Sequence, residues 1–141
     1  MKCYVFVNSY LKGIDVGIQA AHAIARLATQ CSADGDFMDF ERWEQKHSTI
    51  IVLNGGGHDR LEETMNFLTD NEGGAGLWDE EVGVFREPGL NNTFTAVAIV
   101  ANETVCAIMQ ELKEDPEYSK NCCTPDFKLA EFLSKQWTHK G

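Results

Sequence analysis

The chain has 141 residues, of which 43% are hydrophobic and 24% charged, and its formal net charge is −10 at pH 7. These values are typical of one soluble globular domain with its own core, so we expect a single domain over residues 1–141. The acidic balance argues against an extended nucleic-acid surface, because phosphate binding depends on clustered lysine and arginine. No apolar run reaches the roughly 18 residues of a membrane span and no leader-peptide pattern opens the chain, so we expect a cytoplasmic protein without a membrane partner.

The first strand and helix organise the predicted fold. Residues 2–8 are rich in Tyr, Val and Phe and predict a buried strand, which a short loop joins to a helix over residues 15–31 with Asp15 as its N-cap. Asp15, Gln19, His22 and Arg26 fall within roughly 40° of one line on this helix. The other positions are nearly all apolar. The pattern predicts a helix that is buried except for one polar stripe, which faces water, a partner or a ligand.

The middle of the chain alternates between strand and helix patterns. Residues 31–46 predict a packed loop with a helical turn, and residues 48–53 predict a second buried strand. The glycine-rich residues 54–57 indicate either a flexible strand-to-helix connection or a weak version of a phosphate-binding loop. Residues 59–69 predict a helix with an inward face, made of Leu61, Met65 and Leu68.

Two strands and two helices complete the predicted fold. A short third strand over residues 82–86 is joined by a turn at 87–92 to a fourth strand at 93–101, whose alternation places Thr93 and Thr95 on the same face as Val97. Asn102 is the expected cap of a helix to residue 112, and Asp126 that of a last helix to Trp137, with residues 114–125 between them as a loop. This order predicts an α/β fold: a four-stranded mixed sheet, first and fourth strands central, with helices on both faces.

Five cysteines are present, an odd number with no C-x-x-C pair, so neither a disulfide framework nor a zinc ribbon is supported. Three of them, Cys3, Cys31 and Cys106, lie in apolar contexts and are expected in the core. A metal site made of Cys122, Cys123 and His139 is a weak alternative. We therefore expect no metal and no cofactor. The cysteines are Cys3, Cys31, Cys106, Cys122 and Cys123.

The strand followed by GIQAAHA resembles the opening of the type-2 peptidyl-tRNA hydrolases, in which a strand and a glycine-lysine loop precede Ala-Ala-Gln-x-x-His-Ala on the first helix. Gln19, His22 and Ala23 fall on that signature, and Thr93 and Thr95 fall on the family's paired threonines. The order of elements is similar over residues 1–112. The segment EPGLNNTFTAVA also resembles small bacteriophage-encoded proteins grouped loosely with those hydrolases, which implies the host cytoplasm as the location.

Two family positions are changed. Asp15 stands where the family has a catalytic lysine, four residues before the helix glutamine, and the nearest lysine is Lys12. The family's aspartate before the threonine pair is replaced by Glu87, six residues before Thr93, as the only acidic candidate. Two carboxylates make a different electrostatic site from a carboxylate and a lysine, so we expect weak or absent peptidyl-tRNA hydrolysis.

Three functions follow as hypotheses. The first is a phage-type protein that binds a small nucleotide-derived molecule, such as a host immune signal. A stronger form of this hypothesis is that the protein also cleaves the molecule. The second is a peptidyl-tRNA hydrolase with a rearranged site, and the third is a non-catalytic interaction protein. Whether the protein is an enzyme stays open at this point. Because the first helix is so apolar, we also expect a homodimer or a higher homo-oligomer.

The expected ligand site is a crevice at the carboxyl ends of the first and fourth strands, beside the start of the first helix. Candidate catalytic residues are His22, Glu87 and Thr93. Several of these residues also have a structural alternative: His22 as a core histidine, Thr93 and Thr95 as strand formers, and Asn91 with Asn92 as a turn pair. Candidate ligand-binding residues are Lys12, Asp15, Gln19, Arg26, Asn91, Asn92 and Thr95.

Overall fold

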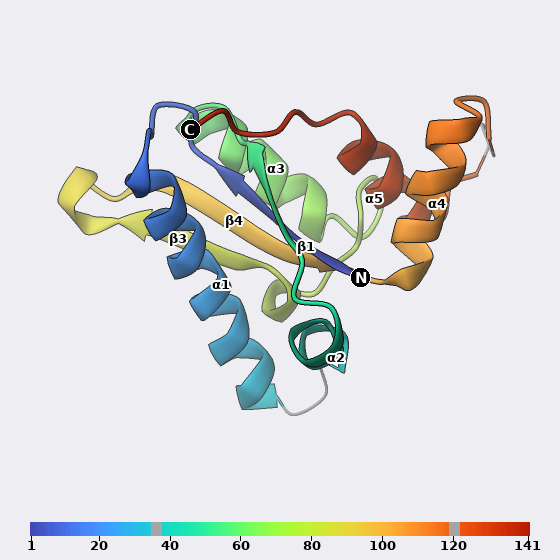
Figure 1. The fold of residues 1–141 in the computed structure, drawn as a ribbon, viewed down its shortest axis with the longest axis horizontal. Coiled ribbons are helices and arrows are strands. Elements are labelled where there is room, and N and C mark those ends of the chain that lie inside the picture. Colours follow the sequence, from blue (N-terminus) through green and yellow to red (C-terminus); the bar gives the residue numbers. More distant parts are fainter. Residues whose placement is uncertain (35–37, 119–121) are drawn as a thin grey trace.

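A computed structural model describes residues 1–34, 38–118 and 122–141 (Figure 1). In order, the elements are β1 (Lys2–Val7), α1 (Ile14–Asp34), α2 (Met38–Lys46), β2 (Ile50–Asn54), α3 (His58–Thr69), the short 3-10 helix η1 (Asp79–Glu81), β3 (Gly83–Glu87), the 3-10 helix η2 (Pro88–Leu90), β4 (Thr93–Ala101), α4 (Glu103–Glu114) and α5 (Pro125–Ser134). Two helices follow β1, one longer helix lies between β2 and β3, and two helices follow β4.

The four strands form one mixed sheet in the order β2-β1-β4-β3, which confirms the predicted α/β class and the central position of β1 and β4. β1 pairs with β2 in parallel, whereas β4 is antiparallel to both β1 and β3. Alternate residues of β1 serve two cores: Tyr4 and Phe6 pack on the side of α3, α4 and α5, and Cys3, Val5 and Val7 on the side of α1 and α2. Helices therefore cover both faces, as expected.

A β-bulge in β4 overturns the predicted alternation of that strand. Phe85 pairs with Ala96 and Arg86 with Phe94, so Thr95 is an extra residue opposite no residue of β3, although its hydroxyl lies 3.3 Å from the Phe85 carbonyl oxygen. Phe94 packs with Val97 in the core beneath α3, whereas Ala96 packs beneath α1. Thr95 therefore faces α1, and it does not share a face with Val97 as predicted.

The first helix is less buried than predicted. It begins at Ile14, so Asp15 lies in its first turn and is not its N-cap. Only one face meets the sheet, which leaves the opposite face exposed to solvent: Ile14, Gly17, Ile18, Ala21 and Ala25. β3 lies unusually close to the inner face, because a Cβ on Gly83 would stand 2.3 Å from the carbonyl oxygen of Ala23. Gly83 thus sets the position of α1 on the sheet.

Several other boundaries and burials differ from the expectations. Residues 38–46 form helix α2 where a loop with one helical turn was expected, and β2 is an edge strand that is mostly only half-buried. Thr124, not Asp126, caps α5, which ends at Ser134, before Trp137. The expected cap at Asn102 is confirmed, because its side chain accepts a hydrogen bond from the backbone N–H of Val105. In the described residues, no helix has the length and apolar character needed to cross a membrane.

Candidate functional site

The predicted crevice at the carboxyl ends of the first and fourth strands does not exist, because these strands run antiparallel. Val7, at the end of β1, pairs with Ala96 near the start of β4, whereas Ala101, at the end of β4, pairs with Lys2. The two carboxyl ends therefore lie at opposite edges of the sheet. The polar candidates gather instead where β1 ends and β4 begins, beside the first turns of α1.

Gln19 is the centre of a hydrogen-bond network at this edge. Its side-chain oxygen accepts a hydrogen bond of 2.6 Å from the hydroxyl of Thr95, and its amide nitrogen donates one of 2.8 Å to Glu87. Gln19 is 6% exposed and Thr95 1%, so the Gln19–Thr95 bond is buried. The other carboxylate oxygen of Glu87 accepts from the backbone N–H of Gly89. The network therefore runs from the bulge in β4 to the half-buried carboxylate that ends β3.

The Glu87 carboxyl is held in its ionised form. The hydrogen bond from Gln19 is the largest cause that lowers the pKa of Glu87 below its ordinary value, followed by the Gly89 N–H and the nearby His22. At neutral pH Glu87 is therefore a carboxylate, which can accept a proton or a hydroxyl hydrogen bond but cannot donate one.

His22 and Arg26 form a basic pair on an aromatic ring. The imidazole of His22 stacks on Phe85 with 4.2 Å between ring centroids and 9° between planes. The Arg26 guanidinium carbon lies 5.9 Å from the same ring centroid. Both basic side chains are exposed, so the interpretation of His22 as a core histidine is wrong. Both groups thus face solvent beside Phe85, and His22 lies close enough to lower the pKa of Glu87.

The remaining candidates lie around this network with less direct roles. Lys12 and Asp15 are exposed at the start of α1. Asn91 and Asn92 are exposed and both have a φ of 57°, so they form the left-handed turn that precedes β4. The hydroxyl of Thr93 donates to the carbonyl oxygen of Leu90 at 2.5 Å, so it is not poised as a nucleophile.

Two polar residues at the same edge escaped the sequence reasoning. Asn8 is buried after the last residue of β1; its amide donates to the Phe94 carbonyl and its oxygen accepts from the Tyr10 N–H. His58 lies on the opposite face, where its Nδ1 accepts from the Phe94 N–H at 2.9 Å and its Nε2 lies 3.4 Å from Glu62. The signals that could have indicated them are an asparagine directly after a strand and a histidine directly after a glycine-rich turn.

Metal binding finds little support in this geometry. Within residues 1–34, 38–118 and 122–141, the group of potential ligands that approach within 4.8 Å of one another is His58, Asp59 and Glu62. Because Nδ1 of His58 accepts from a backbone N–H, the neutral ring carries its hydrogen on Nε2, which leaves that atom no lone pair for a metal. The alternative of Cys122 and Cys123 with His139 is not among the described groups.

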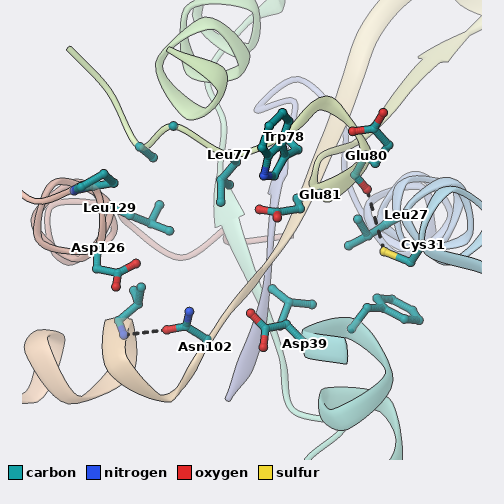
Figure 2. A pocket seen from close by; sticks show the side chains of 16 residues that line it. Leu27, Cys31, Asp39, Leu77, Trp78, Glu80, Glu81, Asn102, Asp126 and Leu129 are labelled. Atoms are coloured by element: carbon teal, nitrogen blue, oxygen red, sulfur yellow. Dashed lines mark hydrogen bonds between the residues drawn. The ribbon is translucent and has the colours of Figure 1, made fainter. Parts of the chain in front are cut away.

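A second feature, not anticipated from the sequence, lies at the other end of the sheet. A hollow of about 840 Å³ opens between the C-terminal turns of α1, the start of α2, the segment before β3 and the start of α5 (Figure 2). No predicted site residue lines it. Its walls come from segments far apart in the chain, so no local sequence motif could predict it.

Comparison of the chain with protein-family models and with curated proteins finds no match.

Proposed function

We propose that the protein binds a small nucleotide-derived ligand at the edge where β1 ends and β4 begins, as a divergent, phage-type relative of the type-2 peptidyl-tRNA hydrolases. The observation that carries the proposal is the double hydrogen bond of Gln19, to Thr95 and to Glu87. It joins three segments of the chain in one network beside the basic pair His22 and Arg26. The resemblance places Gln19 and Thr95 on the family's signature and leaves Glu87 as the candidate for its altered aspartate position.

The charges at this edge suit a ligand with both phosphate and hydroxyl groups. His22, Arg26 and Lys12 are exposed and offer hydrogen bonds to phosphate oxygens, and the first N–H groups of α1 add a partial positive charge. The ionised Glu87 repels phosphate but accepts hydrogen bonds from ribose hydroxyls. If the ligand is also cleaved, His22 is the group that can donate a proton and Glu87 the group that can accept one.

Calorimetry with a panel of cyclic and linear nucleotides tests this proposal. Binding should weaken in His22→Ala and in Asn92→Ala, whereas His47→Ala, an exposed histidine after α2, is the matched control and should bind like wild type. Binding that neither substitution affects would place the site elsewhere. No binding across the panel would favour a non-catalytic interaction protein.

Peptidyl-tRNA hydrolysis is the second candidate, favoured by the same network of Gln19, Glu87 and Thr95. The exposed Asp15 at the family's lysine position and the net charge of −10 work against it, because both repel a tRNA backbone. We expect weak or absent release of peptide from peptidyl-tRNA. Turnover comparable to that of a genuine hydrolase would reverse this ranking, and Lys12→Ala would then test whether Lys12 replaces the missing lysine.

We also propose a homodimer or higher homo-oligomer that uses the outer face of α1. Ile14 is 80% exposed and Ile18 42%, one helical turn apart, and Gly17, Ala21 and Ala25 beside them would allow close approach of a second helix. Light scattering that gives the 15.7 kDa of one chain at micromolar concentration would contradict this proposal.

A further inference from the structure

The hollow at the far end of the sheet exists because β3 is much shorter than β4. The last pair between them is Gly83 with Ala98, so from Ile99 onward β4 has β1 on one side and no strand on the other within the described residues. Residues 75–82 cross this gap without filling it. The resulting space of about 840 Å³ is within the range of small-molecule pockets, which is roughly 300–1,000 Å³.

The rim of the hollow is anchored to α1, so the space is formed before any ligand arrives. The Gln30 side chain donates to the backbone carbonyls of Asp79 and Val82, at 3.1 and 3.3 Å. The Cys31 sulfur lies 3.8 Å from the Glu80 carbonyl oxygen (Figure 2). These contacts hold the turn that carries Trp78 and Glu81 over the opening.

The lining combines an apolar floor with carboxylates from three separate elements. Leu27, Val105 and Leu129 are buried and contribute to the floor. The sixteen lining residues of the described chain include four carboxylates and no basic side chain: Asp39, Glu80, Glu81 and Asp126. Figure 2 shows Leu77, Trp78 and Glu81 on one side of the hollow and Asp39 on the other.

The carboxylates crowd one another without forming a metal site. Burial first, and then the negative charges of Asp39 and Glu80, raise the pKa of Glu81. Arg42 lies 3.7 Å from Asp39 but also pairs with Glu103 outside the hollow, so its charge is shared. These acids are not among the described groups of three whose oxygens approach within 4.8 Å. The negative charge of these carboxylates is therefore not fully neutralised, and it surrounds a space wider than one metal ion needs.

We propose that this hollow binds a small organic cation, an ammonium or guanidinium group carried on an apolar chain or ring. The carboxylates attract the charged head, and the floor takes the apolar part out of water. Trp78 is 70% exposed at the rim and offers an indole face, which attracts a cation through its quadrupole. A nucleotide or another anion meets only repulsion here, so this ligand is distinct from the one proposed at the Gln19 edge.

Phenethylamine and its neutral counterpart phenethyl alcohol separate the charge from the apolar contact. In calorimetry and in nitrogen–proton NMR titration of the full chain, the amine should bind saturably, shift amides of residues 75–81, and bind more weakly as salt rises. The alcohol should bind at least about tenfold more weakly, a difference that corresponds to about 1.4 kcal/mol. Equal binding of the two compounds would overturn the proposal. The absence of saturable amine binding at concentrations up to roughly 10 mM would overturn it as well.

Matched variants place the ligand in the hollow. Glu81→Gln and Trp78→Ala should each weaken amine binding by at least about threefold. Glu63→Gln, an exposed glutamate on α3, and Trp137→Ala, an exposed tryptophan beyond α5, should leave it unchanged. Circular dichroism confirms that each variant is folded. Loss of binding in the controls alone, or binding of a lysine-rich peptide but not of the free amine, would also overturn the small-molecule assignment.

Discussion

Replacing Thr95 by valine tests the buried network at the candidate site. The substitution keeps the shape of the side chain but removes the hydroxyl that donates to Gln19 at 2.6 Å. The side-chain oxygen of Gln19, which is 6% exposed, then lacks its hydrogen-bond donor inside the protein. A buried polar group without a partner costs about 1–3 kcal/mol. For 141 residues the unfolding entropy is about 0.3 kcal/mol/K, so we expect the melting temperature to fall by roughly 3–10 °C.

A double-mutant cycle separates the hydrogen bond from other effects of the substitution. Gln19→Leu removes the other partner, and in the double variant two apolar side chains face each other. The two losses should therefore not add, and the coupling should lie at about 0.5–3 kcal/mol. Thr29→Val on the exposed side of α1 is the control and should change stability by less than about 0.5 kcal/mol. A neutral Thr95→Val, or full additivity, would refute the network.

We also predict that removing Gln19 changes the pH dependence of stability. Because Gln19 lowers the pKa of Glu87, the ionised carboxylate stabilises the fold above its unfolded pKa, and this contribution is lost as pH falls through the lower folded pKa. In Gln19→Leu the Glu87 pKa should return toward its ordinary value, which carbon-detected NMR titration of the carboxyl measures. An unchanged Glu87 pKa would mean that Gln19 is not the main cause of the shift.

Three further predictions test the packing, the hollow and the assembly. Gly83→Ala should destabilise the protein by about 1–3 kcal/mol in urea denaturation, because the new methyl group meets the α1 backbone; an unchanged stability would contradict the close contact of β3 with α1. The pKa of Glu81 is raised in the folded protein, so the protein loses stability as pH rises from the unfolded to the folded pKa of this carboxyl. Glu81→Gln should therefore raise the melting temperature at pH 7 but hardly at pH 4. Equal shifts at both pH values would contradict this. Ile18→Glu should convert the proposed oligomer to a monomer in light scattering, and an unchanged mass would place the interface elsewhere.

Part of the candidate site could be predicted because its residues lie in recognisable local patterns. Gln19 and His22 lie on one predicted helix stripe, and the family resemblance pointed to Glu87 and Thr95. Their mutual arrangement could not be predicted, because the bulge at Thr95 depends on how β3 and β4 pair over a distance in the chain. Without the bulge, strict alternation would place the Thr95 hydroxyl on the opposite face from Gln19.

The sequence alone determined the elements whose signals are local. Apolar runs indicated the strands, helical spacing predicted that Leu61 and Leu68 point inward, and Asn102 was predicted as the cap of α4. Each of these signals depends only on neighbours within a few residues. Only the tertiary structure decided which ends of the strands meet, which face of α1 stays exposed, and that a short β3 leaves an acid-lined hollow. These features depend on pairing and packing between segments distant in the chain, and the period of a single segment carries no information about its partner.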